Sequence, residues 1–141
     1  MTEPAPPPPT VDLDLAWQGD LRFSGTSGAT SITMDGDSAA GPSPVQALLF
    51  GLAGCMAIDV VAILRKGRHP LRDLRGRLHA ERASVAPKRV TRVELRFTVS
   101  GEVPADAVQR AIDLSRQTYC SVWHSLRQDI EFTTAFEIVA A

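Results

Sequence analysis

The stretch SPVQALLFGLAGCMAIDVVAILRK, residues 43–66, decides the fold of this chain. Ser43 is suited to a helix N-cap, Pro44 to the first helical position and Gln46 to the third, which is a capping-box arrangement. Two basic residues and Gly67 close the stretch in the way that helices commonly end. Because the residues are apolar on nearly every face, the sequence predicts a long central helix that is buried all round.

The apolar run at residues 47–64 has the length of a short transmembrane helix. It contains Asp59, Gly51 and Gly54, and no second span follows it, so we interpret it as a core helix and expect no membrane association. Ala47, Gly51 and Cys55 recur every four residues, which makes a stripe of small residues that another backbone can approach closely. One chain of 141 residues offers little cover for such a helix. We therefore predict an intertwined homodimer with the long helices at its centre.

The remaining segments predict an α+β fold. We expect residues 1–10, rich in proline, to be a disordered tail and residues 11–141 to be a single domain. Alternating apolar residues indicate strands before the long helix, at 11–17, 21–23 and 31–34, which form an N-terminal antiparallel meander. After the long helix we expect a second antiparallel sheet and a second helix. Its parts are a hairpin of strands 74–82 and 89–99, a helix at 104–119, a short helical piece at 121–126 capped by Ser121, and a strand at 130–139.

Composition excludes several functional classes. The net charge is −1 and the arginines are scattered, so the chain has no basic surface for nucleic acid. Two cysteines are too few for a secreted disulfide framework. The N-terminus has neither the basic nor the apolar region of a signal peptide, so we expect a cytoplasmic protein.

The two cysteines carry the candidate chemistry. Cys55 and Cys120 are 65 positions apart, so only tertiary folding can bring them together. In a reducing compartment such a pair suggests a redox couple, in which Cys55 attacks a peroxide and Cys120 resolves the oxidised product. The amides that begin the short helix after Cys120 would favour its thiolate. The alternative is that both thiols are small apolar core residues.

Several polar residues are candidates to support the thiols. Arg22 is the only arginine before the long helix, and either it or a cation from the other subunit would activate Cys55. Asp59 requires a partner, and we interpret it either as a polar anchor in a pocket or interface, or as a residue that meets solvent or an arginine. Gln46 either caps the helix or contacts substrate. His124 could join the two cysteines around zinc, but no fourth ligand is apparent, so we expect no metal.

Two motifs carry a resemblance to a known family. Residues 43–61, with Cys55, and residues 111–122, with Cys120, resemble the helix and second-cysteine motifs of the OsmC/Ohr family, and the likeness covers roughly residues 15–139. The resemblance implies an intertwined dimer with two active sites at its interface. It also implies reduction of organic hydroperoxides by Cys55, with Cys120 as the resolving thiol and an external dithiol as reductant, without metal or organic cofactor.

The chain departs from that family at Val45, where active members place a glutamate whose partner is an arginine of the N-terminal strands. This difference favours an alternative function, in which the same fold binds an apolar or thiol-reactive ligand near Cys55 without turnover. A role in small-molecule thiol transfer is a third option.

Overall fold

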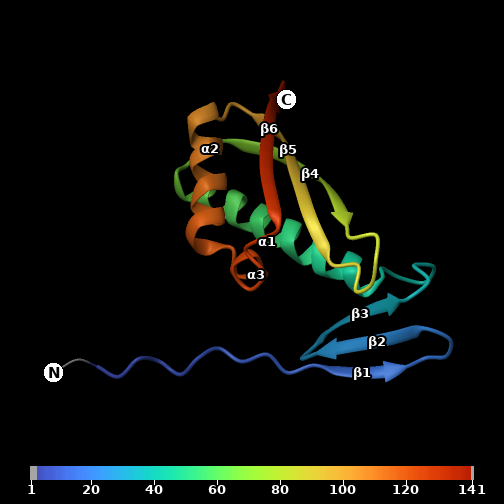
Figure 1. Ribbon diagram of the computed structural model, residues 1–141. Helices are drawn as coiled ribbons and strands as arrows, with labels where there is room; N and C mark the ends of the chain where they lie inside the picture. Colours follow the sequence, from blue (N-terminus) through green and yellow to red (C-terminus); the bar gives the residue numbers. More distant parts are fainter. Residues whose placement is uncertain (1–2, 141) are drawn as a thin grey trace. The chain divides into compact units, whose positions relative to one another are not determined.

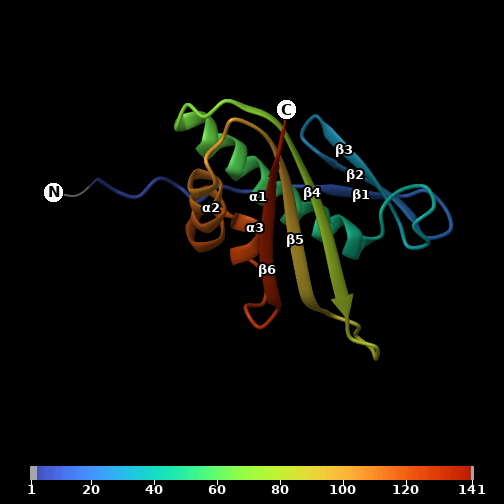
Figure 2. The ribbon, with the colours of Figure 1, turned by 90° about the horizontal axis from the view of Figure 1, so that it is seen from above.

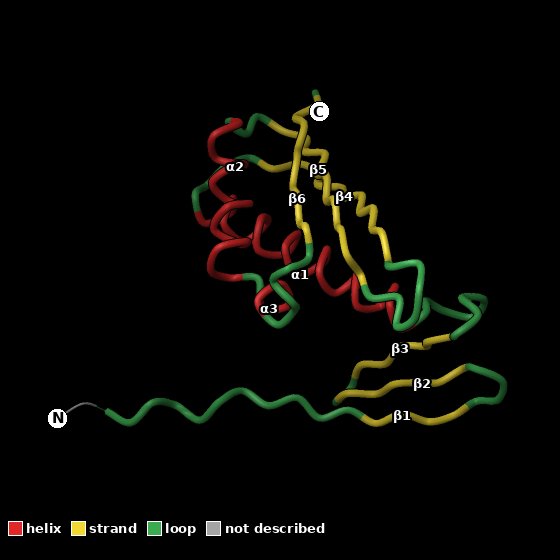
Figure 3. Tube along the Cα trace, viewed as in Figure 1, coloured by secondary structure: helices red, strands yellow, loops and turns green. Residues whose placement is uncertain are grey.

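The computed structural model describes residues 3–140, and these form two compact units that meet in sequence after Leu48. The N-terminal unit contains strands β1 (Asp14–Trp17), β2 (Arg22–Ser27) and β3 (Thr30–Asp35), all antiparallel in the order β1-β2-β3 (Figure 3). This is the predicted meander. Strand β2 is longer than expected, because the turn lies at residues 28–29 rather than over residues 25–28. Gly28 has a φ of +57°, which suits that tight turn.

Residues 3–13 form neither helix nor strand. Residues 1–2 of the predicted tail lie outside the described residues. The prediction of a disordered tail and of a single domain over residues 11–141 stays a prediction.

Helix α1 (Pro44–Lys66) has the predicted bounds. Its capping box is formed: the Gln46 amide donates to Ser43 Oγ at 3.2 Å, and the Ser43 amide donates to Gln46 Oε1 at 2.9 Å. These two bonds satisfy backbone donors that the first turn of a helix otherwise leaves free. The first turn of α1 is therefore specified by its own sequence.

Burial of α1 differs from the prediction, because a single chain covers only one face of the helix. Its buried residues are Leu52, Met56, Val60 and Leu64, four residues apart, which form one stripe. Phe50 is 71% exposed and Ile58 is 70% exposed. Within residues 3–140, α1 is the only helix long and apolar enough to span a membrane, and its buried stripe is part of the hydrophobic core.

The second sheet contains β4 (Leu71–Arg82), β5 (Val90–Gly101) and β6 (Glu131–Val139), in the order β4-β5-β6. Strands β4 and β5 form the predicted antiparallel hairpin. The expected antiparallel pairing holds for β4 and β5 but was wrong for β6, which pairs parallel to β5. The physical reason is the long helical connection between them, because such a crossover returns the chain to the starting edge of the sheet.

The core lies between this sheet and the helices. Four alternating residues of β5 are buried and point to one face, namely Val93, Leu95, Phe97 and Val99. Helices α1 and α2 (Ala105–Leu114) lie on one side of the sheet (Figures 1 and 2). Residues from both helices and from the sheet form one hydrophobic cluster, which fixes α1 and α2 against each other.

The second helix ends differently from the prediction of a regular helix to Tyr119. After α2 the chain forms a π-helical turn, η1 (Ser115–Tyr119), in which the Cys120 amide donates to the Ser115 carbonyl at 2.7 Å. The extra residue in this turn leaves Ser115 and Cys120 fully buried, whereas Tyr119, expected on the buried face, is 57% exposed. The short helix α3 (Ser121–His124) follows.

Cys120, rather than the predicted Ser121, is the N-cap of α3. Its sulfur accepts a hydrogen bond from the Trp123 amide at 3.4 Å. The bond holds the thiol at the start of the short helix, inside the core.

Candidate functional site

The fold brings the two cysteines together. Cys55 lies on α1 and is half-buried, while Cys120 lies at the junction of η1 and α3 and is fully buried. Both are free thiols, and they lie close enough together that the Cys55 side chain raises the pKa of Cys120. Helix α1 and the π-helical turn thus contribute one sulfur each to a single site in the C-terminal unit.

Burial decides the protonation of Cys120. The pKa of Cys120 is raised to about 11, chiefly because burial desolvates the thiol, and also because of the neighbouring Cys55 and the charge of Asp59. The hydrogen bond from the Trp123 amide lowers the Cys120 pKa, as the sequence predicted for a thiol at the start of a helix. The causes that raise the pKa are larger in sum. Cys120 therefore keeps its proton at neutral pH and can donate it in a hydrogen bond to the Cys55 sulfur.

Asp59 lies one helical turn after Cys55, so the two side chains share a face of α1. The Ser115 hydroxyl donates to Asp59 Oδ2 at 2.8 Å. Among the ion pairs of residues 3–140 none involves Asp59, so its partner is a hydroxyl rather than an arginine. Ser115 lies within the helix predicted at residues 104–119, and the sequence assigned it no role.

Arg22 and Gln46, the other two candidate residues, have their partners among the N-terminal residues. The Arg22 guanidinium pairs with Asp20 at 3.1 Å, and it also acts on Asp35. The amides of Ala40 and Asp37 chiefly hold the pKa of Asp35 below its ordinary value, and Arg22 adds to this effect. Arg22 thus has local acidic partners in its own unit.

Gln46 acts as a helix cap. Its Oε1 accepts from the Ser43 amide at 2.9 Å and from the Ser38 hydroxyl at 3.1 Å. This is the first of the two roles that the sequence left open for it.

The surroundings of Cys120 are aromatic. The Trp123 and Phe132 rings lie 4.7 Å apart, and the Arg116 guanidinium lies over Phe132 at 4.8 Å. His124 is exposed. In the part of the chain that the structure describes, no three histidine, cysteine or acidic residues are arranged to hold a metal ion.

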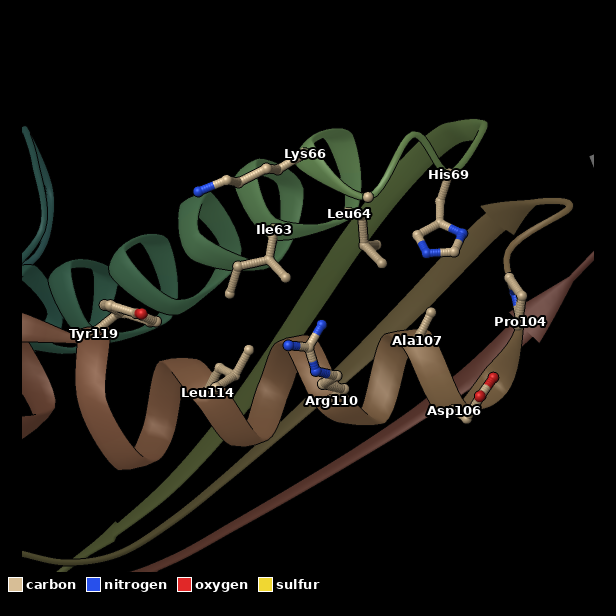
Figure 4. A pocket seen from close by; sticks show the side chains of 11 residues that line it. Ile63, Leu64, Lys66, His69, Pro104, Asp106, Ala107, Arg110, Leu114 and Tyr119 are labelled. Atoms are coloured by element: carbon tan, nitrogen blue, oxygen red, sulfur yellow. The ribbon is translucent and has the colours of Figure 1, made fainter.

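A cavity of about 620 Å³ lies between the C-terminal part of α1 and helix α2. Figure 4 shows Ile63, His69 and Arg110 directed into this space from their elements. Neither cysteine lines it. The lining residues are Ile63, Leu64, Lys66, Gly67, His69, Pro104, Asp106, Ala107, Arg110, Leu114 and Tyr119.

This cavity adjoins the cysteine site along both helices. Ile63 is one turn beyond Asp59, and it lies roughly 12 Å along the helix axis from Cys55 at 1.5 Å per residue. Leu114 and Tyr119 each immediately precede a member of the site, Ser115 and Cys120 respectively. A partly apolar space therefore lies farther along the same two helices, although neither cysteine lines it.

The chain is similar to known proteins over most of its length. The sequence profile of the OsmC-like proteins matches residues 35–135. Protein YhfA of Escherichia coli K12 is 43% identical over 130 residues, which are 90% of this chain and 97% of YhfA. A solved structural-genomics chain is 39% identical with a TM-score of 0.84, and the match covers 92% of this chain and 99% of that chain.

A crystal structure of an organic hydroperoxide resistance protein from Elizabethkingia anophelis has a TM-score of 0.67 to this chain. Its identity is 15%, over 94% of this chain and 99% of that chain, so this likeness concerns the fold alone. Together with the profile and with YhfA, it confirms the α+β fold and the resemblance found in the sequence. The chain belongs to the OsmC-like family.

Proposed function

We propose that this protein reduces organic hydroperoxides by thiol chemistry, with Cys55 as the nucleophile and Cys120 as the resolving thiol. The observation that carries the proposal is the proximity of two free cysteines 65 positions apart, which is close enough for Cys55 to raise the pKa of Cys120. A family that includes proteins named for organic hydroperoxide resistance supports the same chemistry.

The protonation of the pair supports the assignment of roles. The fully buried Cys120 holds its proton, while Cys55 is half-buried and more accessible to a peroxide. The Cys55 thiolate attacks the outer oxygen of ROOH, the O–O bond breaks, and ROH leaves after taking a proton. Cys55 becomes a sulfenic acid. The Cys120 thiol then condenses with it, which forms a disulfide and releases water.

An external dithiol completes the cycle by exchange with the Cys55–Cys120 disulfide. Two electrons pass from the dithiol to the peroxide in each turnover, so the reaction requires neither a metal nor an organic cofactor. The cavity beside the site has apolar walls at Ile63, Leu64 and Leu114, which suits a hydroperoxide with an organic tail better than hydrogen peroxide. We place this activity in the cytoplasm, where reducing dithiols are available.

The working form in this proposal is an intertwined homodimer. The uncovered face of α1 exposes Phe50 and Ile58, and both Gly51 and Gly54 have open space where a Cβ would stand. In the N-terminal sheet, Leu15 and Ile32 are also more than half exposed. Apolar surfaces of this kind are stabilised when a partner removes them from water, and a second copy of the chain has matching surfaces.

Val45 supports a second candidate function. The active members of the family place a glutamate at this position, and a valine offers no carboxylate to orient a peroxide or an arginine. A protein of this fold without that carboxylate would bind an apolar or thiol-reactive ligand near Cys55 and would not turn it over.

Peroxide consumption separates these functions. The reduced protein, its Cys55→Ser variant and its Cys120→Ser variant would be mixed with an alkyl hydroperoxide and a dithiol, and the remaining peroxide followed with time. The proposal predicts turnover that Cys55→Ser abolishes, and over-oxidation of Cys55 in Cys120→Ser. Full activity of Cys55→Ser would disprove the assignment of the nucleophile, and no turnover by the unaltered protein would favour the binding function.

A further inference from the structure

We propose that Asp59 is the proton acceptor for Cys120 when this thiol resolves the oxidised Cys55, and that Ser115 positions the Asp59 carboxylate for the transfer. This inference rests on the proposed function and adds to it an acid–base residue. The carboxylate belongs to the chain's own C-terminal unit.

The resolving step needs such a group. Cys120 is fully buried and protonated, and only the thiolate is an effective nucleophile toward sulfur. With a pKa of about 11, roughly one Cys120 in 10⁴ is ionised at pH 7. A base beside the thiol removes this obstacle, because it accepts the proton while the S–S bond forms.

The geometry points to Asp59 as that base. It follows Cys55 by one helical turn on the same face of α1, and its negative charge acts on Cys120. Ser115 is fully buried, and its hydroxyl donates to Asp59 Oδ2 at 2.8 Å. The same Ser115 accepts the Cys120 amide at 2.7 Å through its carbonyl. One residue of the π-helical turn therefore fixes both the carboxylate and the thiol's backbone.

No other ionisable group has an equivalent position. The groups whose charges act on Cys120 are Cys55 and Asp59, both from α1. From η1, Arg116 lies over an aromatic ring and is a cation, and from α3 His124 is exposed. The β5 residues of the core are apolar. Asp59 is thus the only carboxylate among the described residues that acts on this thiol.

The step balances without a further reactant. The Cys120 sulfur attacks the Cys55 sulfenic sulfur, and its proton passes to Asp59. The S–O bond of Cys55 breaks, and the departing hydroxide takes the proton from Asp59 and leaves as water. The products are the Cys55–Cys120 disulfide, one water molecule and an Asp59 carboxylate in its original state.

The test is the rate of disulfide formation in Asp59→Asn. The asparagine oxygen keeps the hydrogen bond from Ser115, but the side chain no longer accepts a proton. Asp113→Asn is the matched control, because it makes the same change on α2, where the carboxylate accepts from Gln109. Each reduced protein would be oxidised with one equivalent of an alkyl hydroperoxide, quenched with an alkylating agent, and its disulfide quantified by mass over time from pH 6 to pH 9.

The two roles of Asp59 predict changes of opposite sign. If Asp59 is the base, Asp59→Asn slows disulfide formation at pH 7 by about 100-fold or more, as removal of a general base commonly does. The rate then rises about tenfold per pH unit, because it follows the Cys120 thiolate. If Asp59 is only a nearby charge, its removal makes Cys120 more acidic and disulfide formation becomes faster. An unchanged or faster rate overturns the proposal, as does the same slowing in Asp113→Asn.

A peroxide-free arm keeps this inference distinct from the proposed function. An aromatic disulfide such as 5,5′-dithiobis(2-nitrobenzoate) labels Cys55, and attack by Cys120 then releases a second coloured thiolate. A slower second release in Asp59→Asn supports the proton transfer even if peroxide oxidises neither thiol, which would count against the proposed function alone. Equal rates of second release in Asp59→Asn and the unaltered protein overturn the inference.

Discussion

The ionisation of Cys120 gives a quantitative test of the site. Its pKa of about 11 lies two units above the ordinary value of 9.0. At pH 7 its thiolate fraction is therefore about 100-fold smaller than that of an ordinary thiol, and burial slows a reagent further. We expect iodoacetamide to label Cys120 at least about 100-fold more slowly than a free thiol at pH 7, with a rate that increases up to about pH 11.

The Cys55→Ser variant separates the causes of this shift. Replacement of Cys55 by serine removes a charge that raises the Cys120 pKa, so the titration midpoint falls. Desolvation, the largest cause, remains, and the midpoint stays above 9.0. The assay is the labelling rate of the Cys120 peptide by mass spectrometry between pH 6 and pH 11. A midpoint below 9.0 in the unaltered protein, or no change in Cys55→Ser, would refute the reasoning.

The same shift predicts a loss of stability in alkali. The unfolded Cys120 loses its proton near pH 9.0, whereas the folded one keeps it to about pH 11. The stability that comes from this raised pKa is complete below pH 9 and disappears as the pH rises through the folded pKa of about 11. A difference of two pKa units corresponds to about 2–3 kcal/mol of unfolding free energy. Urea denaturation of the unaltered protein and of Cys120→Ser measures this difference, and parallel pH profiles would contradict it.

Three further predictions follow from the packing, and one from the family. Ser115→Ala leaves the half-buried Asp59 without its donor, so the free energy of unfolding in urea should fall by about 1–3 kcal/mol; an unchanged value would mean that water replaces the hydroxyl. Met56→Ala should cost about 2–5 kcal/mol in the same assay, because it opens a cavity in the buried stripe of α1. Ile58→Glu places a charge on the uncovered face, so sedimentation should show a monomer where the unaltered protein is a dimer; a monomer in both would end the dimer proposal. Val45→Glu should raise the rate of peroxide consumption if the missing carboxylate limits the activity, and an equal rate would show that it does not.

Local signals explain why the long helix could be predicted from the sequence. Its N-terminus depends on Ser43 and Gln46, which bond to each other's backbone, and its C-terminus on Gly67. The strands of the two hairpins were also predictable, because alternation between apolar and polar residues is a local property. These elements together determined the α+β class.

Other features depend on tertiary contacts that the sequence does not display. The π-helical turn leaves Ser115 and Cys120 buried, and local propensity does not distinguish it from a regular helix over the same residues. The N-cap of α3 is therefore Cys120 instead of the predicted Ser121, and Tyr119 is exposed. The parallel pairing of β6 could have been foreseen, because a helical crossover follows β5.

The candidate site was predicted in part. The sequence indicated that Cys55 and Cys120 would meet only through folding, and the fold does place Cys55 near enough to raise the pKa of Cys120. Their chemical roles stay a prediction. The partner of Asp59 was not foreseen, because a serine 56 positions away carries no local sign of the contact. Arg22 was proposed because it is the only arginine before the long helix, and in the structure it pairs with Asp20 and acts on Asp35.

The central claim is that Cys55 and Cys120 form a working redox pair, and the mass of the intact protein tests it most directly. The reduced protein would be treated with one equivalent of an organic hydroperoxide, and its intact mass would be measured by mass spectrometry before and after addition of a dithiol. The account predicts the loss of two hydrogen atoms, restored by the dithiol and absent in Cys55→Ser. An unchanged mass would contradict it, because the two thiols would then be inert toward the peroxide.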